Sequence, residues 1–282
     1  MDRRTARATA ERHDDSVTHS NESALDALAS RLHQARSAGT VLDASRTASA
    51  LSMDTAYAVQ QRLTVLRLAE GRCHVGYKLG YTSAVMRRQM GVTAPNYGPL
   101  LDDMVLRSGA TATGFLQPRV EPEVGVVLDR DLPEPPVLLS EAADAVRTVH
   151  ACLEIVDSIW DGYRFSAEQN TADGSSAAGV VLGPRLDVSP MDCHRVPVEL
   201  REDATTVATA TSAAVGGHPL RSIVWLARTL AARGEQLRRG ELIITGGLTA
   251  AVPLRPEAVI SARFGADAEV TIRRSDTSQN GS

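Results

Sequence analysis

The sequence predicts an α+β protein in which a helical N-terminal region precedes a β-rich domain built on a mixed sheet. Before residue 70, apolar residues recur at helical spacing, whereas from residue 71 short Val/Ile-rich runs alternate with Gly and Pro. These runs do not alternate regularly with helical segments, which argues against a doubly wound parallel sheet. The predicted units are a disordered tail over 1–22, the helical region over 23–70, the β-rich domain over 71–275 and a second disordered tail over 276–282.

Two helices are predicted in the N-terminal region. The first covers 23–38 and stops at Gly39, and the second begins near Ser52, a good N-cap residue, and ends at Gly71. The apolar face of the first helix consists of Leu25, Leu28, Ala29 and Leu32, and that of the second of Ala56, Val59, Leu63 and Leu66.

The β-rich domain is predicted to contain about eight strands. Their segments read "EVGVVL", "ACLEIVDS", "AAGVVLG", "VPVEL", "TTVATATSAAV", "ELIITGG", "AVISARFG" and "AEVTIRR". Three short helical segments interrupt them, over 82–90, 139–149 and 219–233, and the last carries a clear apolar stripe.

Composition excludes several classes of function. The chain has 282 residues and a formal net charge of −4, and its arginines are scattered rather than clustered beside aromatic residues, so nucleic acid is not an expected partner. No apolar stretch approaches the ~20 residues that span a bilayer, and the basic N-terminus lacks the apolar core of a secretory signal. The cysteines Cys73, Cys152 and Cys193 form no disulfide pattern, which points to the reducing cytoplasm.

Two carboxylates stand out at the start of a predicted strand, in the segment "VEPEV". Because side chains alternate along a strand, Glu121 and Glu123 point to the same face. Pro122 between them cannot donate to a ladder, which predicts an edge strand or a bulge. A third acid, Glu154, lies inside another core-like strand, where an unpaired carboxylate is costly. A shared hard cation such as Mg²⁺ or Mn²⁺ explains all three.

Simpler interpretations remain open for these residues. An E-x-E pattern on a strand is also typical of a solvated face, and Glu154 could pair with an arginine. Lys78 lies between Gly76 and Gly80, where the backbone can approach a ligand closely, but it also fits a surface lysine. Neither CxxC nor HExxH is present to support a zinc site.

Several short motifs occur in the order and spacing of one known family. They read "GYKLGYTS", "RRQMGVTAPNYGPL", "QPRVEPEVGVVL", "LEIVDS", "TADGSS" and "GELIITGGLTAAV". Together, from about residue 45 to 256, they resemble the 2-keto-4-pentenoate hydratase and 4-oxalocrotonate decarboxylase branch of the fumarylacetoacetate hydrolase superfamily. The resemblance implies a fumarylacetoacetate hydrolase-like mixed β-sheet roll with an N-terminal helical region.

The resemblance also implies a set of site residues. Mg²⁺ or Mn²⁺ would be held by Glu121, Glu123 and Glu154, with Lys78 in the substrate pocket and Asn96 as a second candidate catalytic residue. The substrate-binding candidates are Ser176, Arg164, Thr245, Gly246 and Thr249.

The implied activity is that of a divalent-metal-dependent lyase on an unsaturated 2-oxo acid. The cation acts as a Lewis acid and stabilises the enolate that forms during the reaction. Hydratases of the family usually carry an aspartate where this chain has Asn96, which favours a 4-oxalocrotonate decarboxylase-like reaction over hydration of 2-keto-4-pentenoate. The expected substrate is a small 2-oxo acid, and neither nucleic acid nor a membrane is an expected partner.

Two further alternatives stay open. One is an acylpyruvate-type hydrolase, although His74 is the only histidine in the segment where a water-activating His–Glu pair is expected. The other is a non-catalytic partner of a related enzyme. The resemblance further implies a homo-oligomer and an association with a related hydratase or decarboxylase.

Overall fold

The computed structural model describes residues 22–132 and 138–275. The disordered tails predicted over 1–22 and 276–282 lie outside the described residues, except for Glu22, which is helical. None of the helices in the described ranges has both the length and the apolar character needed to cross a bilayer.

Helices account for the N-terminal region and for short connections within the β-rich domain. Residues 22–37 are helical, and the helices that follow are α2 (Ala44–Thr47), α3 (Met53–Ala69), α4 (Ala84–Met90), α5 (Leu139–Asp144), α6 (Ala167–Ala172) and α7 (Leu220–Ala231). Four short 3-10 turns are η1 (Asp102–Met104), η2 (Asp161–Tyr163), η3 (Pro190–Arg195) and η4 (Ser212–Ala214).

The described strands form two mixed sheets. The larger sheet has the order β2-β1-β10-β5-β6-β7-β3, with β11 also paired to β5, and the smaller has the order β4-β13-β12-β8-β9. The first seven strands are β1 (His74–Gly80), β2 (Asn96–Leu101), β3 (Val105–Arg107), β4 (Ala110–Ala112), β5 (Arg119–Leu128), β6 (Val146–Val156) and β7 (Ala177–Arg185). The remaining strands are β8 (Pro197–Glu202), β9 (Thr205–Thr211), β10 (Leu242–Ile244), β11 (Val252–Pro253), β12 (Val259–Phe264) and β13 (Ala268–Arg274).

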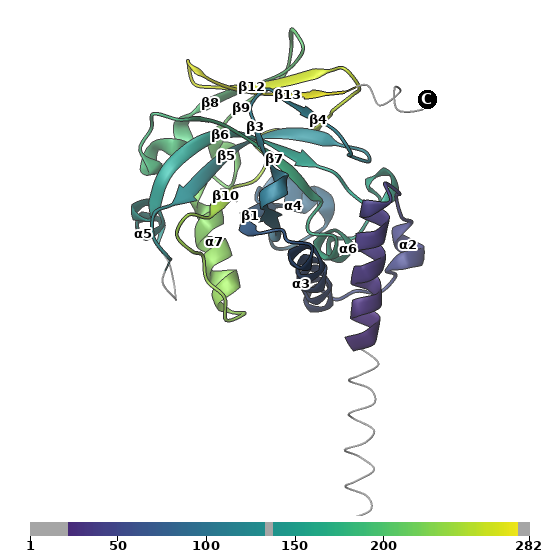
Figure 1. Ribbon diagram of the computed structural model, residues 1–282. Helices are drawn as coiled ribbons and strands as arrows, with labels where there is room; N and C mark the ends of the chain where they lie inside the picture. Colours follow the sequence, from purple (N-terminus) through teal and green to yellow (C-terminus); the bar gives the residue numbers. More distant parts are fainter. Residues whose placement is uncertain (1–21, 133–137, 276–282) are drawn as a thin grey trace, which may run out of the picture.

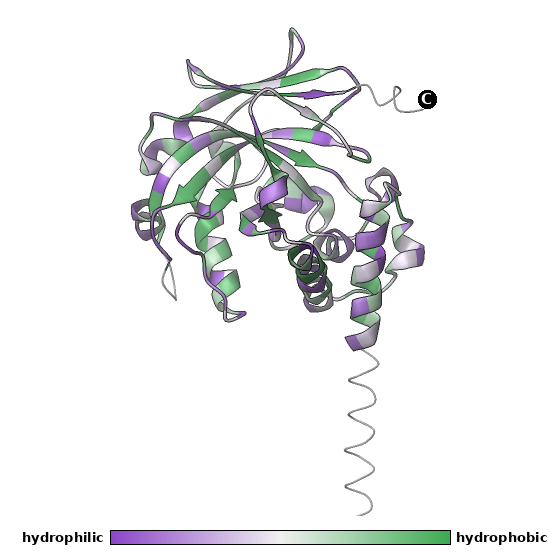
Figure 2. Cartoon of the chain, in the orientation of Figure 1, coloured by the Kyte–Doolittle hydropathy of each residue, from purple (hydrophilic) through white to green (hydrophobic). Residues whose placement is uncertain are grey.

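The two sheets and the helices form layers. In Figure 1 the smaller sheet lies above the larger sheet, and the helices lie below the larger sheet. The main apolar core joins both sheets to α7, and Figure 2 shows apolar residues along α7 and through the strands. A second cluster fills the space between the N-terminal helices and the domain. The predicted α+β class, with a helical region before a β-rich domain, is confirmed.

Most predicted elements are present, with one clear error. Ser52 caps α3 by accepting a hydrogen bond from the Thr55 amide, and each of the eight predicted strand segments contains a strand. The helix predicted over 139–149 is wrong beyond Asp144, because β6 begins at Val146. Val146 and Val149 pair with residues of β5, so sheet pairing overrides the local helical pattern there.

The N-terminal helices pack around a buried tryptophan of the β-rich domain. Trp160 is fully buried and its indole Nε1 donates to the Gln169 carbonyl over 2.9 Å. Leu32 from helix 22–37 and Val59 from α3 belong to the same apolar cluster as Trp160. The helical region therefore covers the domain where β6 ends.

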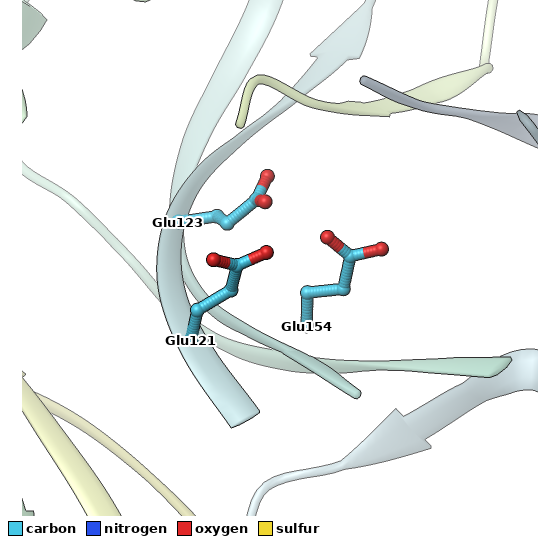
Figure 3. Close-up of side chains that lie close together, drawn as sticks. All are labelled: Glu121, Glu123 and Glu154. Carbon is cyan, nitrogen blue, oxygen red and sulfur yellow. The ribbon is translucent and has the colours of Figure 1, made fainter. Parts of the chain in front are cut away.

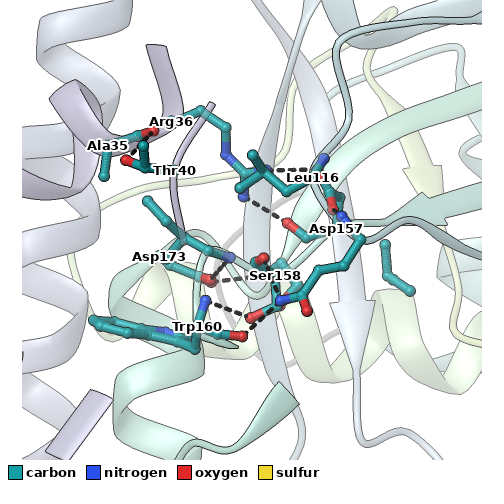
Figure 4. A network of polar contacts seen from close by, with 12 residues as sticks. Ala35, Arg36, Thr40, Leu116, Asp157, Ser158, Trp160 and Asp173 are labelled. Atoms are coloured by element: carbon teal, nitrogen blue, oxygen red, sulfur yellow. Dashed lines mark hydrogen bonds and ion pairs between the residues drawn. The ribbon is translucent and has the colours of Figure 1, made fainter. Parts of the chain in front are cut away.

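An ion pair fastens the same junction. Arg36, near the end of helix 22–37, pairs with the fully buried Asp157 just after β6, with Nη1 and Oδ2 2.8 Å apart (Figure 4). The two Asp157 carboxylate oxygens also accept from the amides of Leu116 and Gln117, over 2.8 and 2.7 Å. Asp157 thus ties the N-terminal helix to the segment that leads into β5.

Replacing Asp157 by asparagine is expected to destabilise the protein by about 3 kcal/mol, because it leaves Arg36 without an anionic partner and one of the two backbone amides without an acceptor. Urea denaturation followed by circular dichroism measures the change. The matched control is Arg147→Gln, which breaks an exposed pair with Asp129 and should cost no more than about 1 kcal/mol. Equal losses in the two variants would show that the Asp157 network is not a special contributor to stability.

Candidate metal centre and substrate cavity

Three glutamates converge where β5 and β6 run side by side. The register places Glu121 directly opposite Glu154, and Glu123 follows two residues later on the same face of β5. One carboxylate oxygen from each lies within 4.8 Å of the others, and Figure 3 shows the three side chains pointing toward one another. Their geometry is therefore that of a shared ligand set.

The proline in this stretch marks neither of the predicted features, because β5 is an interior strand and its register with β6 continues through Pro122 without a bulge. On one side β5 pairs with β6, and on the other with β10 and then β11, which leaves a gap opposite residues 121–124. The Pro122 carbonyl accepts from the Leu248 amide, 2.9 Å away in the loop that crosses this gap. Because the nitrogen and carbonyl of a residue in an antiparallel strand face the same side, the missing donor of Pro122 interrupts no strand pairing.

The carboxylates are buried and incompletely paired. Glu123 and Glu154 are 0% and 1% exposed, yet one oxygen of Glu123 and both of Glu154 lack a hydrogen-bond partner. Lys78 Nζ lies 2.9 Å from Glu154 Oε1, close enough for an ion pair although the angles do not make a hydrogen bond. One ammonium cannot balance three carboxylates, so the donor set fits a divalent cation with an affinity for hard oxygen ligands.

The pKa values of these side chains follow from their burial and mutual charge. Burial, and then the charge of Glu154, raises the pKa of Glu121 to about 8, and the same causes raise the pKa of Glu123 above its ordinary range. Burial opposes the charged form of Lys78, but its attraction to the three glutamates outweighs burial and raises its pKa. The charge of Lys78 therefore depends on the glutamates beside it.

Two consecutive glycines let a loop close over the cluster. The Gly246 amide donates to Glu123 Oε2 over 2.7 Å, with Gly246 at a φ of +113° that favours glycine. A Cβ at position 247 would lie 2.1 Å from Glu121 Oε2. A Cβ at position 246 would instead lie 2.0 Å from Thr82 Oγ1, so a side chain at 247 would displace the loop from Glu121 and one at 246 would displace it from Thr82.

A cavity of about 380 Å³ opens beside the cluster. Lys78, Glu121 and Ser176 line one part of it, and Met86 and Phe165 contribute apolar surface elsewhere on its wall. A cavity with charged groups and an apolar surface suits a small anionic molecule with a hydrocarbon portion.

The predicted Ser176 lies in a constrained turn at the cavity wall. Ser175 and Ser176 have φ values of 60° and 54°, which are uncommon for residues with a side chain. The Ser176 hydroxyl donates to Asn170 Oδ1 over 2.7 Å, and its amide donates to Asp173 Oδ1 over 2.8 Å. Lys78 Nζ donates to the Ser175 carbonyl over 3.1 Å, so the turn and the carboxylate cluster share a contact.

Asn96 lies behind this turn rather than on the cavity wall. It is 1% exposed, its Nδ2 donates to Thr171 Oγ1, and its Oδ1 accepts from Ser175 Oγ, each over 3.0 Å. Asn96 therefore contacts Ser175 from behind the cavity wall, and its predicted catalytic role stays a prediction.

The structure brings only some of the predicted substrate-binding residues to the cavity. Thr245 is buried with its hydroxyl bonded to the Val124 carbonyl, and the Thr249 hydroxyl donates to the carbonyl of Ala250. Gly246 contacts Glu123 through its amide. Arg164 points to solvent, with 78% of its side chain exposed and paired to Asp161, and it is not among the cavity-lining residues.

Sequence reasoning missed the arginine that does line the cavity. Arg119 is the first residue of β5 and stands two residues before Glu121 on the same face. The alternation rule that joined Glu121 to Glu123 applies equally to Arg119 and would have found it. Tyr81 and Asn170, which also line the cavity and share a hydrogen bond of 2.8 Å, carry no comparable signal in the sequence.

Comparison with known proteins identifies the family. Residues 80–277 match the family model described as "Fumarylacetoacetate (FAA) hydrolase C-terminal". The chain belongs to the fumarylacetoacetate hydrolase family. The predicted family membership is confirmed, and it covers the strands that carry the glutamate cluster.

Curated members of the fumarylacetoacetate hydrolase family extend the likeness to most of the chain. A 2-keto-4-pentenoate hydratase from Paraburkholderia xenovorans (strain LB400) is 36% identical and the match covers 90% of this chain and 96% of that protein. A 4-oxalocrotonate decarboxylase from a Pseudomonas species is 35% identical, over 82% of this chain and 91% of that protein.

A solved structure from the family has the same fold. It is the 4-oxalocrotonate decarboxylase from Pseudomonas putida G7 complexed with magnesium and adipate. Its TM-score to this chain is 0.84 at 30% identity, and the superposition covers 89% of this chain and 97% of that one. The predicted roll-like fold of this family is confirmed.

Replacing Glu123 by glutamine should weaken Mn²⁺ binding about 100-fold or more, because it removes one anionic ligand and places an amide among unpaired oxygens. Isothermal titration calorimetry of the folded, metal-stripped protein measures the affinity. Glu269→Gln, an exposed change on β13, is the control and should bind as the parent does. Parental affinity in the Glu123 variant would exclude this carboxylate as a ligand.

Replacing Asn96 by aspartate should destabilise the protein by about 1–3 kcal/mol, because the Thr171 hydroxyl already donates to the Ala167 carbonyl and cannot satisfy a second acceptor. Thermal and urea denaturation report the loss. The control is Gln61→Glu, the same amide-to-acid change at an exposed position of α3. An Asn96 variant as stable as this control would contradict the buried, donor-dependent environment.

Proposed function

We propose that this protein is a divalent-metal-dependent lyase that decarboxylates an unsaturated 2-oxo acid, in the manner of 4-oxalocrotonate decarboxylase. The observation that carries the proposal is the glutamate cluster, with three carboxylate oxygens that accept no hydrogen bond, beside a cavity. A family member with the same fold is complexed with magnesium and adipate, which supports both a divalent cation and a small carboxylic acid as ligands here.

Each residue of the site has a proposed role that follows from its chemistry. Glu121, Glu123 and Glu154 would hold Mg²⁺ or Mn²⁺, which when bound supplies a Lewis acid that draws electrons toward the 2-oxo group. Lys78 lies beside the same glutamates on the cavity wall, where its ammonium would attract the substrate's 2-oxo-acid carboxylate. The turn at Ser176 offers a hydroxyl and shapes the wall beside Lys78. Met86 and Phe165 keep water away from the hydrocarbon portion of the substrate.

The cavity wall favours decarboxylation over hydration. Adding water to a conjugated alkene needs a group that activates the water, whereas loss of CO₂ needs only an electron sink. Among the described residues that line the cavity, Glu121 is the sole carboxylate and there is no histidine. The side chain of Asn96 lies behind the wall and does not distinguish the two reactions.

Hydration of 2-keto-4-pentenoate is the second candidate. A hydratase with that name is 36% identical over nearly the whole chain, and both reactions use the same electron sink. The acylpyruvate hydrolase alternative has less support, because His74 lies 3.5 Å from Glu241 at the start of β1 and is not on the cavity wall. The intact glutamates and Lys78 weigh against a non-catalytic partner.

The homo-oligomer, the association with a related enzyme and the cytoplasmic location stay predictions from the sequence. The proposal itself needs only a small 2-oxo acid and a divalent cation, because the carboxylate cluster, Lys78 and the cavity all come from one chain.

With Mg²⁺ present, the protein should release CO₂ from 4-oxalocrotonate, and EDTA should lower the rate at least about 100-fold because the electron sink is removed. Ultraviolet absorbance follows the substrate, and trapped CO₂ and the organic product identify the reaction. Restoring MgCl₂ after EDTA is the control and should restore the rate. Conversion of 2-hydroxypentadienoate to a 4-hydroxy-2-oxo acid without CO₂ release would favour the hydratase, and equal rates with EDTA would contradict both.

A further inference from the structure

Arg119 occupies a position from which it can contact a molecule bound at the glutamate cluster. It shares a strand face with Glu121 and Glu123, and both Arg119 and Glu121 line the cavity. Their backbone positions are about 6.8 Å apart along the strand. The chain therefore places the Arg119 side chain on the same cavity wall as Glu121 of the carboxylate cluster.

The guanidinium is held in place by an aromatic ring. Its carbon lies 4.1 Å from the centroid of the Tyr163 ring, a cation–π distance. The Tyr163 hydroxyl lies 3.0 Å from the Gln117 carbonyl and 2.9 Å from that of Val156, which fixes the ring. Stacking against a fixed ring orients the planar fork of Arg119 without using its hydrogen-bond donors.

Those donors have no anionic partner in the described part of the chain. Arg119 takes part in none of the ion pairs found there, whereas Arg164 nearby is paired with Asp161. Lys78, the other cation on the cavity wall, is already paired with Glu154. The Arg119 guanidinium is half-buried, oriented and without a carboxylate partner. It therefore offers a binding site for a carboxylate group.

We propose that Arg119 binds the second carboxylate of a dicarboxylic 2-oxo acid and so selects diacids over monoacids. The inference rests on the proposed function for the position of the 2-oxo end at the glutamate cluster. It deepens that function by naming the residue that recognises the second carboxylate, because a monocarboxylic acid leaves Arg119 without a partner.

Contact between Arg119 and the second carboxylate should affect KM more than kcat. In the proposed reaction the second carboxylate leaves as neutral CO₂, so its attraction to Arg119 is present in the bound substrate and fades as the C–C bond breaks. The electron pair of that bond passes through the double bond to the 2-oxo group, and the enolate that results takes up a proton from water. Loss of the guanidinium should therefore raise KM for the diacid without lowering kcat.

The experiment compares adipate with hexanoate, a diacid and a monoacid of equal carbon number, by isothermal titration calorimetry on the Mg²⁺-loaded full chain. Wild type should prefer adipate, and Arg119→Gln should reduce adipate affinity about 10- to 100-fold and abolish the preference. Arg119→Lys keeps the charge but loses the planar fork, so this variant should recover part of the preference for adipate. Arg147→Gln, an exposed change on β6, controls for net charge and should leave the preference intact.

The results separate this inference from the proposed function, because binding preference and turnover are read independently. A wild-type protein that binds the two acids equally, or an Arg119→Gln variant that keeps the preference, would overturn the diacid subsite even if the enzyme is active. A fall in kcat for 4-oxalocrotonate with unchanged KM in the folded variant would also overturn it. Failure of wild type to turn over either 2-oxo acid, with the adipate preference present, would count against the reaction and not against the subsite.

Discussion

The mutual repulsion of three buried carboxylates is the interaction on which the rest of the site depends. Two unit charges about 4 Å apart interact by about 4 kcal/mol near a protein surface, and the oxygens of Glu121, Glu123 and Glu154 lie within 4.8 Å of one another. Lys78 offsets part of this repulsion, and the Gly246 amide offsets a little more. When all three are ionised, the remaining negative charge is what a divalent cation would neutralise, and three of the carboxylate oxygens accept no hydrogen bond.

The fold holds these charges together by placing them on its most rigid elements. β5 and β6 are interior strands of the larger sheet, and register alone brings Glu121 opposite Glu154. The less regular parts are then fixed to that frame: the 245–251 loop by the Pro122 carbonyl, and the serine turn by Asn96. Asp157, three residues beyond Glu154, fixes the end of β6 to the N-terminal helix. A site built in this way keeps its geometry before any ligand arrives.

Much of this arrangement could be predicted from the sequence, and the exceptions have physical causes. Alternation along a strand joins Glu121 to Glu123, but placing Glu154 opposite them requires a strand register that one sequence does not encode locally. The side-chain directions of Asn96 and Arg164, at a strand end and in a loop, could not be predicted either. The order and spacing of motifs do not specify which way a side chain points. The helix predicted over 139–149 failed because Val146 gains more from pairing with β5 than from its local pattern.

The central claim is that the three glutamates form one divalent cation site. A crystal grown with Mn²⁺ and measured at the manganese absorption edge tests it directly, because the anomalous signal locates the ion without reference to the protein coordinates. The account predicts one strong peak between the carboxylates of Glu121, Glu123 and Glu154, at about 2.2 Å from an oxygen of each. A peak elsewhere, or none at these residues with Mn²⁺ in excess, would contradict it.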